Sequence, residues 1–300
     1  MGVSKTAMRT AILAVGLIVL AFNAVAATPE EAWKAGIADQ NKHYAQVPHA
    51  MLKIQDSAYL RDGDAVVLQG RQGQPGSWHW NHDAKAKGAL GVSLKGGRLS
   101  VTQNGKPLEP GEIRKSVVVD KDVDVAGEPT QVGAGIPGWR FFVYNQQNPV
   151  AKAFTTVSYF PYDPAFRVTA RLTADAKLSP HVFRTSRGTD KQFYHAGNAT
   201  FALQGKTIVL PFYSDDRDPA GIKSMTAFFT DDLTGHGAYS TGRYVDVEDF
   251  GKFPPATVLI DFNNAYNPNC ARSAHFTCPV AIDTIRLAVK AGERDPHVAH

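Results

Sequence analysis

The sequence predicts a mostly β protein, with antiparallel sheets in a barrel- or sandwich-like arrangement and one N-terminal helix. Turn residues recur roughly every eight to twelve residues through most of the chain, as they do in all-β proteins. Asn104-Gly105 separates two short strand-like runs, and this dipeptide is the strongest short-range signal of a hairpin. Residues 166–173 alternate apolar and polar side chains, which is the period of a half-buried strand.

Residues 1–27 have the pattern of a secretory signal peptide. Lys5 and Arg9 form a basic start, residues 11–22 are apolar, and Ala24-Val25-Ala26 offers a small-x-small cleavage site. We therefore expect an exported bacterial protein, periplasmic or secreted, with no stable membrane anchor after cleavage. An uncleaved anchor is the alternative reading, but the apolar stretch is short for a membrane span.

The charge balance argues against binding to nucleic acid. The chain has 32 Lys and Arg residues against 28 Asp and Glu, and the loss of Lys5 and Arg9 with the signal peptide leaves a net charge of +2. No run of basic residues concentrates this charge, although such runs are the usual footprint of nucleic acid or anionic lipid binding.

Residues 28–48 predict the N-terminal helix. Thr28 can cap it, Pro29 suits its first position, Glu31 completes a capping box, and Pro48 ends it. An N-terminal β-rich half is expected over residues 49–150 and a C-terminal β-rich half over 151–300. Further strands or hairpins are expected at 65–68, 99–106, 116–119, 139–144, 201–210, 225–230, 258–261 and 285–289.

Trp78 and Trp80 alternate on an expected strand, so both rings point to the same face of it. If that face is exposed, the rings form a stacking platform for a sugar or another ring. If it is covered, they belong to the core, which is where aromatic strand residues usually pack.

Cys270 and Cys278 are the two cysteines of the chain and lie eight positions apart. In an exported protein this spacing predicts a disulfide. A zinc site would need further ligands, such as His275 and His236, and the spacing alone does not support one. We therefore predict no metal site, and the sequence identifies no cofactor.

Asp261 ends an apolar strand and is followed by a loop rich in asparagine, which includes Asn263 and Asn267. A carboxylate at such a strand end is a candidate general base or ligand contact. The alternative is structural, because Asp and Asn side chains often hold irregular loops by bonding to the backbone.

His236 and Arg243 follow another expected strand. His236 stands between two glycines and is a candidate base. Arg243 is a candidate clamp for a carboxylate or phosphate. Equally, Arg243 could pair inside the protein with one of three acidic residues: Asp231, Asp232 or Asp261.

Several segments together resemble the bacterial domain-of-unknown-function family numbered 1684. They are Asp-Phe-Asn-Asn-Ala-Tyr-Asn-Pro-Asn-Cys at 261–270, Thr-Cys-Pro at 277–279 and Ala-Gly-Glu at 291–293, with further similarity at 160–168, 201–206 and 241–244. The resemblance extends over roughly residues 50–295 and implies a β-rich fold, but no activity. It draws attention to Tyr239, Arg243, Asp261, Asn263, Tyr266, Asn267, Cys270 and Cys278. Members of this family also occur without signal peptides, where these cysteines would stay reduced.

Two functions remain open. The first is a small-molecule or glycan-binding module that uses Tyr239, Arg243 and Tyr266, together with the Trp78 and Trp80 platform. The second is a hydrolase-type enzyme with Asp261 or His236 as base and Arg243 as anion clamp. Binding is favoured, because the sequence contains no recognisable pair of nucleophile and base.

Overall fold

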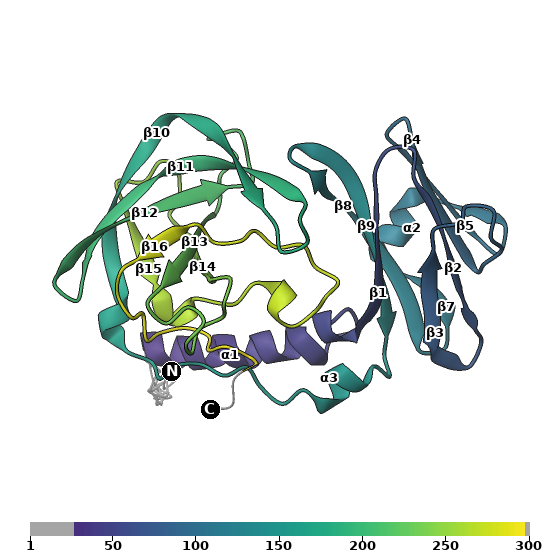
Figure 1. Cartoon of the computed structure of the whole chain (residues 1–300), viewed down its shortest axis with the longest axis horizontal. Coiled ribbons are helices and arrows are strands. Elements are labelled where there is room, and N and C mark those ends of the chain that lie inside the picture. Colours follow the sequence, from purple (N-terminus) through teal and green to yellow (C-terminus); the bar gives the residue numbers. More distant parts are fainter. Residues whose placement is uncertain (1–26, 298–300) are drawn as a thin grey trace, which may run out of the picture.

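The computed structural model describes residues 27–297, which form a long N-terminal helix and two β-rich halves. Figure 1 shows the N-terminal half, β1–β9, beside the C-terminal half, β10–β16, with α1 running beneath the latter. The predicted fold class is confirmed, because antiparallel strands make up most of the regular structure.

Helix α1 (Pro29–Ala45) begins as its sequence predicts. The Thr28 hydroxyl accepts a hydrogen bond from the Glu31 amide at 3.3 Å, and the Glu31 carboxylate accepts one from the Thr28 amide at 2.8 Å. These two bonds satisfy amides that a helix start leaves without partners. The indole nitrogen of Trp33 then donates to the carbonyl of Asn263 at 2.8 Å, which ties the helix to the C-terminal half.

The N-terminal half is a sandwich of two sheets, one ordered β1-β9-β8-β7 and the other β3-β2-β4-β5-β6. The strands are β1 (Ile54–Leu60), β2 (Ala65–Arg71), β3 (Gln74–Asn81), β4 (Leu90–Lys95), β5 (Arg98–Gln103), β6 (Lys106–Leu108), β7 (Val117–Asp120), β8 (Val123–Gly133) and β9 (Ile136–Asn145). Apolar side chains of both sheets meet in one core, to which Leu68, Val92 and Phe141 belong.

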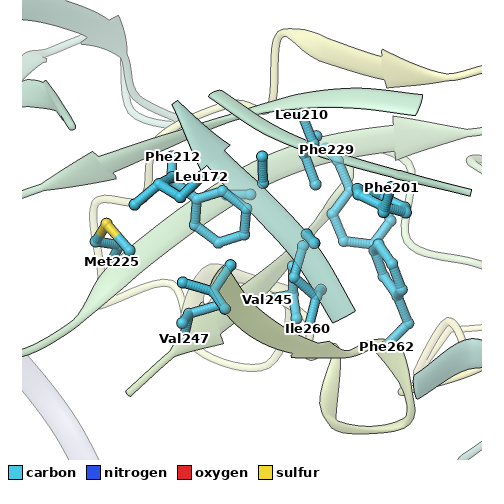
Figure 2. Close-up of a cluster of buried hydrophobic side chains, with 14 of the residues drawn as sticks. Leu172, Phe201, Leu210, Phe212, Met225, Phe229, Val245, Val247, Ile260 and Phe262 are labelled. Atoms are coloured by element: carbon cyan, nitrogen blue, oxygen red, sulfur yellow. The ribbon is translucent and has the colours of Figure 1, made fainter. Parts of the chain in front are cut away.

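The C-terminal half is one curled sheet ordered β14-β13-β12-β11-β10-β15, with β16 parallel to β13. The strands are β10 (Arg167–Arg184), β11 (Asp190–Leu203), β12 (Lys206–Ser214), β13 (Met225–Asp231), β14 (Arg243–Val247), β15 (Thr257–Asp261) and β16 (Asp283–Ile285). Its concave side holds the larger core. Figure 2 shows side chains from several of these strands converging there, among them Phe212, Phe229 and Ile260.

Short helical segments fill the connections. They are α2 (Pro110–Lys115), α3 (Pro149–Ala153), η1 (Met51–Lys53), η2 (Pro164–Phe166), η3 (Phe262–Asn264) and η4 (Asn269–Ala271). The sequence predicts only α1, because segments this short have no apolar periodicity to detect.

Two predicted hairpins are confirmed by their turns. Asn104 and Gly105, between β5 and β6, have φ angles of 50° and 78°. Gln204 and Gly205, between β11 and β12, have φ angles of 50° and 76°. Positive φ at both central residues is the geometry of a two-residue turn that matches the twist of the flanking strands.

The strand expected at residues 285–289 is only partly present. β16 ends at Ile285, and the following residues run irregularly although Leu287 and Val289 are buried. The reason is that the backbone of Val289 bonds to the buried side chains of Arg243 and Asp231 instead of to a neighbouring strand, as described below.

The signal peptide predicted for residues 1–27 lies outside the described residues, apart from residue 27. Within residues 27–297, no helix is long and apolar enough to cross a membrane.

The hypothesis of a stacking platform at Trp78 and Trp80 is wrong. The two residues are 2% and 8% exposed and belong to the core of the sandwich. The indole nitrogen of Trp78 donates to the Asp120 carboxylate at 3.2 Å, and the Trp80 ring packs edge-on against Phe141. The face on which the two rings lie is therefore the covered face of β3.

Replacement of Trp78 by alanine should lower the free energy of unfolding by about 3–5 kcal/mol, because it leaves a large cavity in the sandwich. Chemical denaturation of the purified variant measures this loss. Val118→Ala on β7 is the control, since Val118 is 65% exposed, and it should change stability by less than about 0.5 kcal/mol. A Trp78→Ala protein as stable as that control would contradict the core assignment.

Candidate functional site

A buried ion pair joins β13 to β14. Arg243 is 1% exposed, and its guanidinium donates to the Asp231 carboxylate at 2.9 Å. The same guanidinium donates to the carbonyl of Val289 at 2.9 Å and also to the carbonyls of Ala291 and Glu293. Burial lowers the pKa of Arg243, and the charge of Asp231 opposes that shift. Of the two roles considered for Arg243, the structure therefore has the internal pair, and the guanidinium is buried and not accessible to a ligand.

Glu293 is a second buried charge, which the sequence reasoning missed. It is 0% exposed and pairs with Arg272 at 2.9 Å. Four more groups donate to its carboxylate: the amide of Asn267 at 3.0 Å, Gln40 Nε2 at 3.0 Å, the Tyr44 hydroxyl at 3.3 Å and the Tyr159 hydroxyl at 3.4 Å. Burial and the Glu293 charge raise the pKa of both tyrosines, so that both remain neutral donors.

Glu293 thereby holds the loop that follows β15. Gly292, beside it, has a φ angle of 81°, and a Cβ atom there would lie 2.5 Å from the carbonyl oxygen of Ala265. Only glycine allows the C-terminal segment to pass so close to the loop. The sequence signal was the Ala-Gly-Glu segment itself, but nothing in it shows that the carboxylate faces inward.

Asp261 and the asparagines after it hold this loop together. The Asp261 carboxylate accepts hydrogen bonds from the amide of Asn263 at 3.0 Å and from its side chain at 2.9 Å. Asn263 is 1% exposed and bonds both backbone groups of Asp163. Asn267 is 0% exposed and donates to the carbonyl of Arg294 at 2.8 Å. Neither asparagine presents its side chain to a ligand, whereas Asp261 remains half-buried at the edge of a groove.

That groove has a volume of 490 Å³ and lies between the start of α1 and the strands β14 and β15. It brings together two of the predicted ligand contacts, Asp261 and Tyr266. Its walls are formed by Pro29, Ala32, Trp33, Arg167, Asp246, Glu248, Asp249, Leu259, Asp261, Asn264 and Tyr266. The groove is thus lined by four carboxyl groups, one guanidinium and two aromatic rings.

Tyr266 and Asp246 form a hydrogen-bonded pair on the groove wall. The tyrosine hydroxyl donates to Asp246 at 2.9 Å, and the Thr226 hydroxyl donates to the other carboxylate oxygen at 2.6 Å. Partial loss of its water shell raises the pKa of Asp246, while these two hydrogen bonds oppose the shift. Burial and the neighbouring Asp246 charge raise the pKa of Tyr266, so its hydroxyl remains a donor.

The two cysteines are free thiols in this structure, so the predicted disulfide is not confirmed. The sulfur of Cys278 instead accepts a hydrogen bond from the amide of Cys270 at 3.3 Å. Burial raises the pKa of the neighbouring Tyr239, and so does Cys270. Within residues 27–297, no group of three or more His, Cys, Asp or Glu side chains is placed to hold a metal ion.

His236, the other candidate base, lies in an exposed turn between β13 and β14, where its amide donates to the carbonyl of Leu233 at 2.8 Å. The anion clamp expected to act with it, Arg243, is instead buried against Asp231. The structure therefore does not assemble the base and clamp that the hydrolase hypothesis combines.

A carboxylate–imidazole pair lies elsewhere and was not predicted. His195 Nδ1 is 2.7 Å from Asp175 Oδ2, across the paired strands β10 and β11. The His195 ring packs edge-on against Tyr213, whose hydroxyl donates to Asp283 at 3.4 Å. Asp175 and His195 are 20 positions apart in the sequence, and Asp175 lies where the pairing of β10 with β11 is irregular, so the sequence gives no sign of this pair.

A larger groove of 710 Å³ lies between the β8–β9 hairpin, the start of β11 and the residues that follow β12. Its charged lining is mixed, with Lys191 and Arg217 facing Asp215 and Asp216. It contains none of the residues predicted from the sequence, and the smaller groove at Asp261 is therefore the stronger candidate.

Comparison with known proteins bears on the C-terminal half. Residues 152–294 match the family described as "Protein of unknown function (DUF1684)". The predicted resemblance is confirmed over this segment, which is shorter than the expected 50–295. A solution NMR structure of an uncharacterized protein from Haloarcula marismortui is 29% identical, covers 50% of this chain and 82% of that chain, and has a TM-score of 0.42. No curated protein matches the chain.

Asp231→Asn should lower the free energy of unfolding by about 3–5 kcal/mol, because it leaves the buried charge of Arg243 facing a neutral amide. Urea titration followed by circular dichroism measures the effect. Asp190→Asn is the matched control, since Asp190 pairs with Arg184 at 3.1 Å on the surface, and its loss should be at most about 1 kcal/mol. Equal losses in the two variants would show that an unpaired Arg243 costs the fold no more than an unpaired surface charge.

Proposed function

We propose that this protein is a small-molecule-binding module, and that its ligand occupies the 490 Å³ groove beside Asp261 and Tyr266. The observation that carries the proposal is the composition of that groove. Most small-molecule sites are concave and combine aromatic surface with a few convergent polar groups. Here Trp33 and Tyr266 supply the aromatic surface, and Asp261 and Arg167 supply polar groups.

The groove favours a ligand rich in hydroxyl or amino groups. Its four carboxyl groups can accept hydrogen bonds from either kind of donor, while a single guanidinium leaves the groove with a negative balance. An anionic ligand would meet repulsion there, since like charges disfavour association. A neutral or amino sugar matches both the acceptors and the aromatic rings, and it is the first ligand class to test.

The hydrolase hypothesis has less support. It needs Arg243 as a clamp, but that side chain is buried and already bonded to Asp231 and three carbonyl groups. Its candidate base Asp261 accepts two hydrogen bonds from Asn263 on one carboxylate oxygen, so that oxygen is already occupied in holding the loop.

A glycan array that contains neutral, amino and acidic sugars tests the ligand class. We expect binding to neutral or amino sugars and none to acidic ones. For a sugar that binds, Asp261→Asn should weaken affinity about tenfold, equivalent to roughly 1.4 kcal/mol, through loss of a charge-assisted hydrogen bond. The amide keeps the oxygen that Asn263 bonds, so the loop should stay folded.

Asp232→Asn is the matched control, because Asp232 is exposed after β13 and outside the groove. It should leave affinity unchanged in calorimetric titration. If Asp261→Asn bound the sugar as tightly as Asp232→Asn does, the ligand would lie elsewhere and the groove assignment would fail. Binding restricted to acidic sugars would contradict the proposed ligand class.

We further propose that the protein is exported, on the strength of Lys5, Arg9, the apolar residues 11–22 and the small residues at 24–26. Expression of the full chain in a bacterium should yield a shortened protein in the periplasm or the medium. N-terminal sequencing should place its first residue at Ala27 or Thr28. A full-length chain that remains with the membrane or the cytoplasm would contradict export.

A further inference from the structure

We propose that Cys270 and Cys278 form a redox-active dithiol that exchanges with small-molecule disulfides, with Cys270 as the attacking thiol and Cys278 as the resolving thiol. This inference is independent of the ligand proposed for the groove. It differs from the structural disulfide that the sequence predicts, because it requires both the reduced and the oxidised state to be accessible in the folded protein.

The two thiols are adjacent yet unbonded. Both are free, and the Cys270 amide donates to the Cys278 sulfur at 3.3 Å. A sulfur that lies this close to the neighbouring cysteine's backbone needs only a local side-chain movement to reach the other sulfur. The bond length required is about 2.05 Å.

The two thiols differ in their exposure to solvent. Cys270 is half-exposed in the short turn η4, whereas Cys278 is only 7% exposed. The backbone of Cys278 is held beside the end of β10, since the Ser186 amide donates to the Cys278 carbonyl at 2.8 Å. An external disulfide therefore reaches Cys270 first, and the more buried Cys278 can react only afterwards.

Polar groups surround the Cys270 thiol. A hydrogen bond from Cys278 lowers the pKa of the Cys270 thiol, burial opposes this shift, and the hydroxyls of Ser186 and Tyr239 add to it. Its hydrogen bond to Cys270, together with burial, raises the pKa of Cys278. Because the thiolate is the nucleophile in exchange, this asymmetry also favours Cys270 as the attacking group.

The reaction balances in two steps. The Cys270 thiolate attacks one sulfur of a disulfide R–S–S–R, forms the mixed disulfide Cys270–S–S–R and releases one thiolate, which takes up the proton that Cys270 lost. Cys278 then loses its proton and attacks the sulfur of Cys270. The second thiolate leaves and is protonated, so the protein is oxidised by two electrons and the small disulfide is reduced to two thiols.

Oxidised glutathione is the probe for the experiment, which uses the folded protein near neutral pH. The reaction is stopped with acid and read as intact mass after alkylation of the remaining thiols. The wild type should lose both thiols and carry no glutathione, because Cys278 resolves the mixed disulfide. Cys278→Ser should retain one glutathionyl group on Cys270. Cys270→Ser should react about tenfold or more slowly, because Cys278 is buried.

Three controls apply if a substitution disturbs the fold. Cys278→Ala serves as a second resolving-thiol variant, and near-UV circular dichroism checks the fold of each protein. In denaturant, the two single-cysteine variants should react at equal rates, because the difference in exposure is then lost. Equal rates in the folded variants, or a wild type that keeps both thiols or a stable glutathione adduct, would overturn the proposal.

The role of Tyr239 provides a readout that a purely structural role would not affect. Tyr239→Phe removes a hydroxyl that stabilises the Cys270 thiolate. In the Cys278→Ser background, the pH midpoint of glutathione addition should therefore move upward. An unchanged midpoint would remove Tyr239 from the mechanism, and a midpoint in the parent variant equal to that of the denatured chain would contradict an activated Cys270.

Discussion

The C-terminal half depends on buried side chains that form hydrogen bonds with the backbone of residues 289–293. This segment is not in a strand, so its polar groups need other partners. Arg243 donates to three of its carbonyl groups, and the Asp231 carboxylate accepts from the amide of Val289. Burying such charges carries a large desolvation penalty, which this many hydrogen bonds offset. The main effect of the pair is therefore to fix one path for the chain, and its net contribution to stability is smaller.

The path of that segment decides where the candidate sites lie. It delivers Glu293 to a buried position at which Arg272 and the amide of Asn267 bond the same carboxylate oxygen. The loop between them carries Cys270, and Tyr266 immediately precedes it. On its other oxygen Glu293 accepts from Gln40 of α1, so the helix that supplies Trp33 to the groove is fixed by the same carboxylate. The groove and the dithiol are thus separate chemical features held by one buried network.

Local features of the fold could be predicted from the sequence, and features that depend on distant contacts could not. Asn104-Gly105 and the capping box at Thr28 are complete within a few residues, so their geometry follows from the sequence alone. The alternation of Trp78 and Trp80 placed both rings on one face of β3 but could not show that the second sheet covers it. Asp175 and His195 meet at an irregularity in the pairing of β10 with β11, between Ala174 and Ser179. Arg243 illustrates the same limit, since the sequence left a ligand clamp and an internal pair equally open.

The free thiols and the expected export bear on each other. In an oxidising compartment a disulfide that stabilised the fold would normally stay closed. Here the loop that bears the cysteines is already ordered without a bond, through Glu293 on one side and Ser186 on the other. Closing the bond would therefore add little order to the loop, and so little stability to the oxidised state. Such a disulfide is more easily reduced than one that orders an otherwise flexible loop. The two cysteines are therefore better suited to thiol–disulfide exchange than to a permanent structural disulfide, in whichever compartment the protein resides.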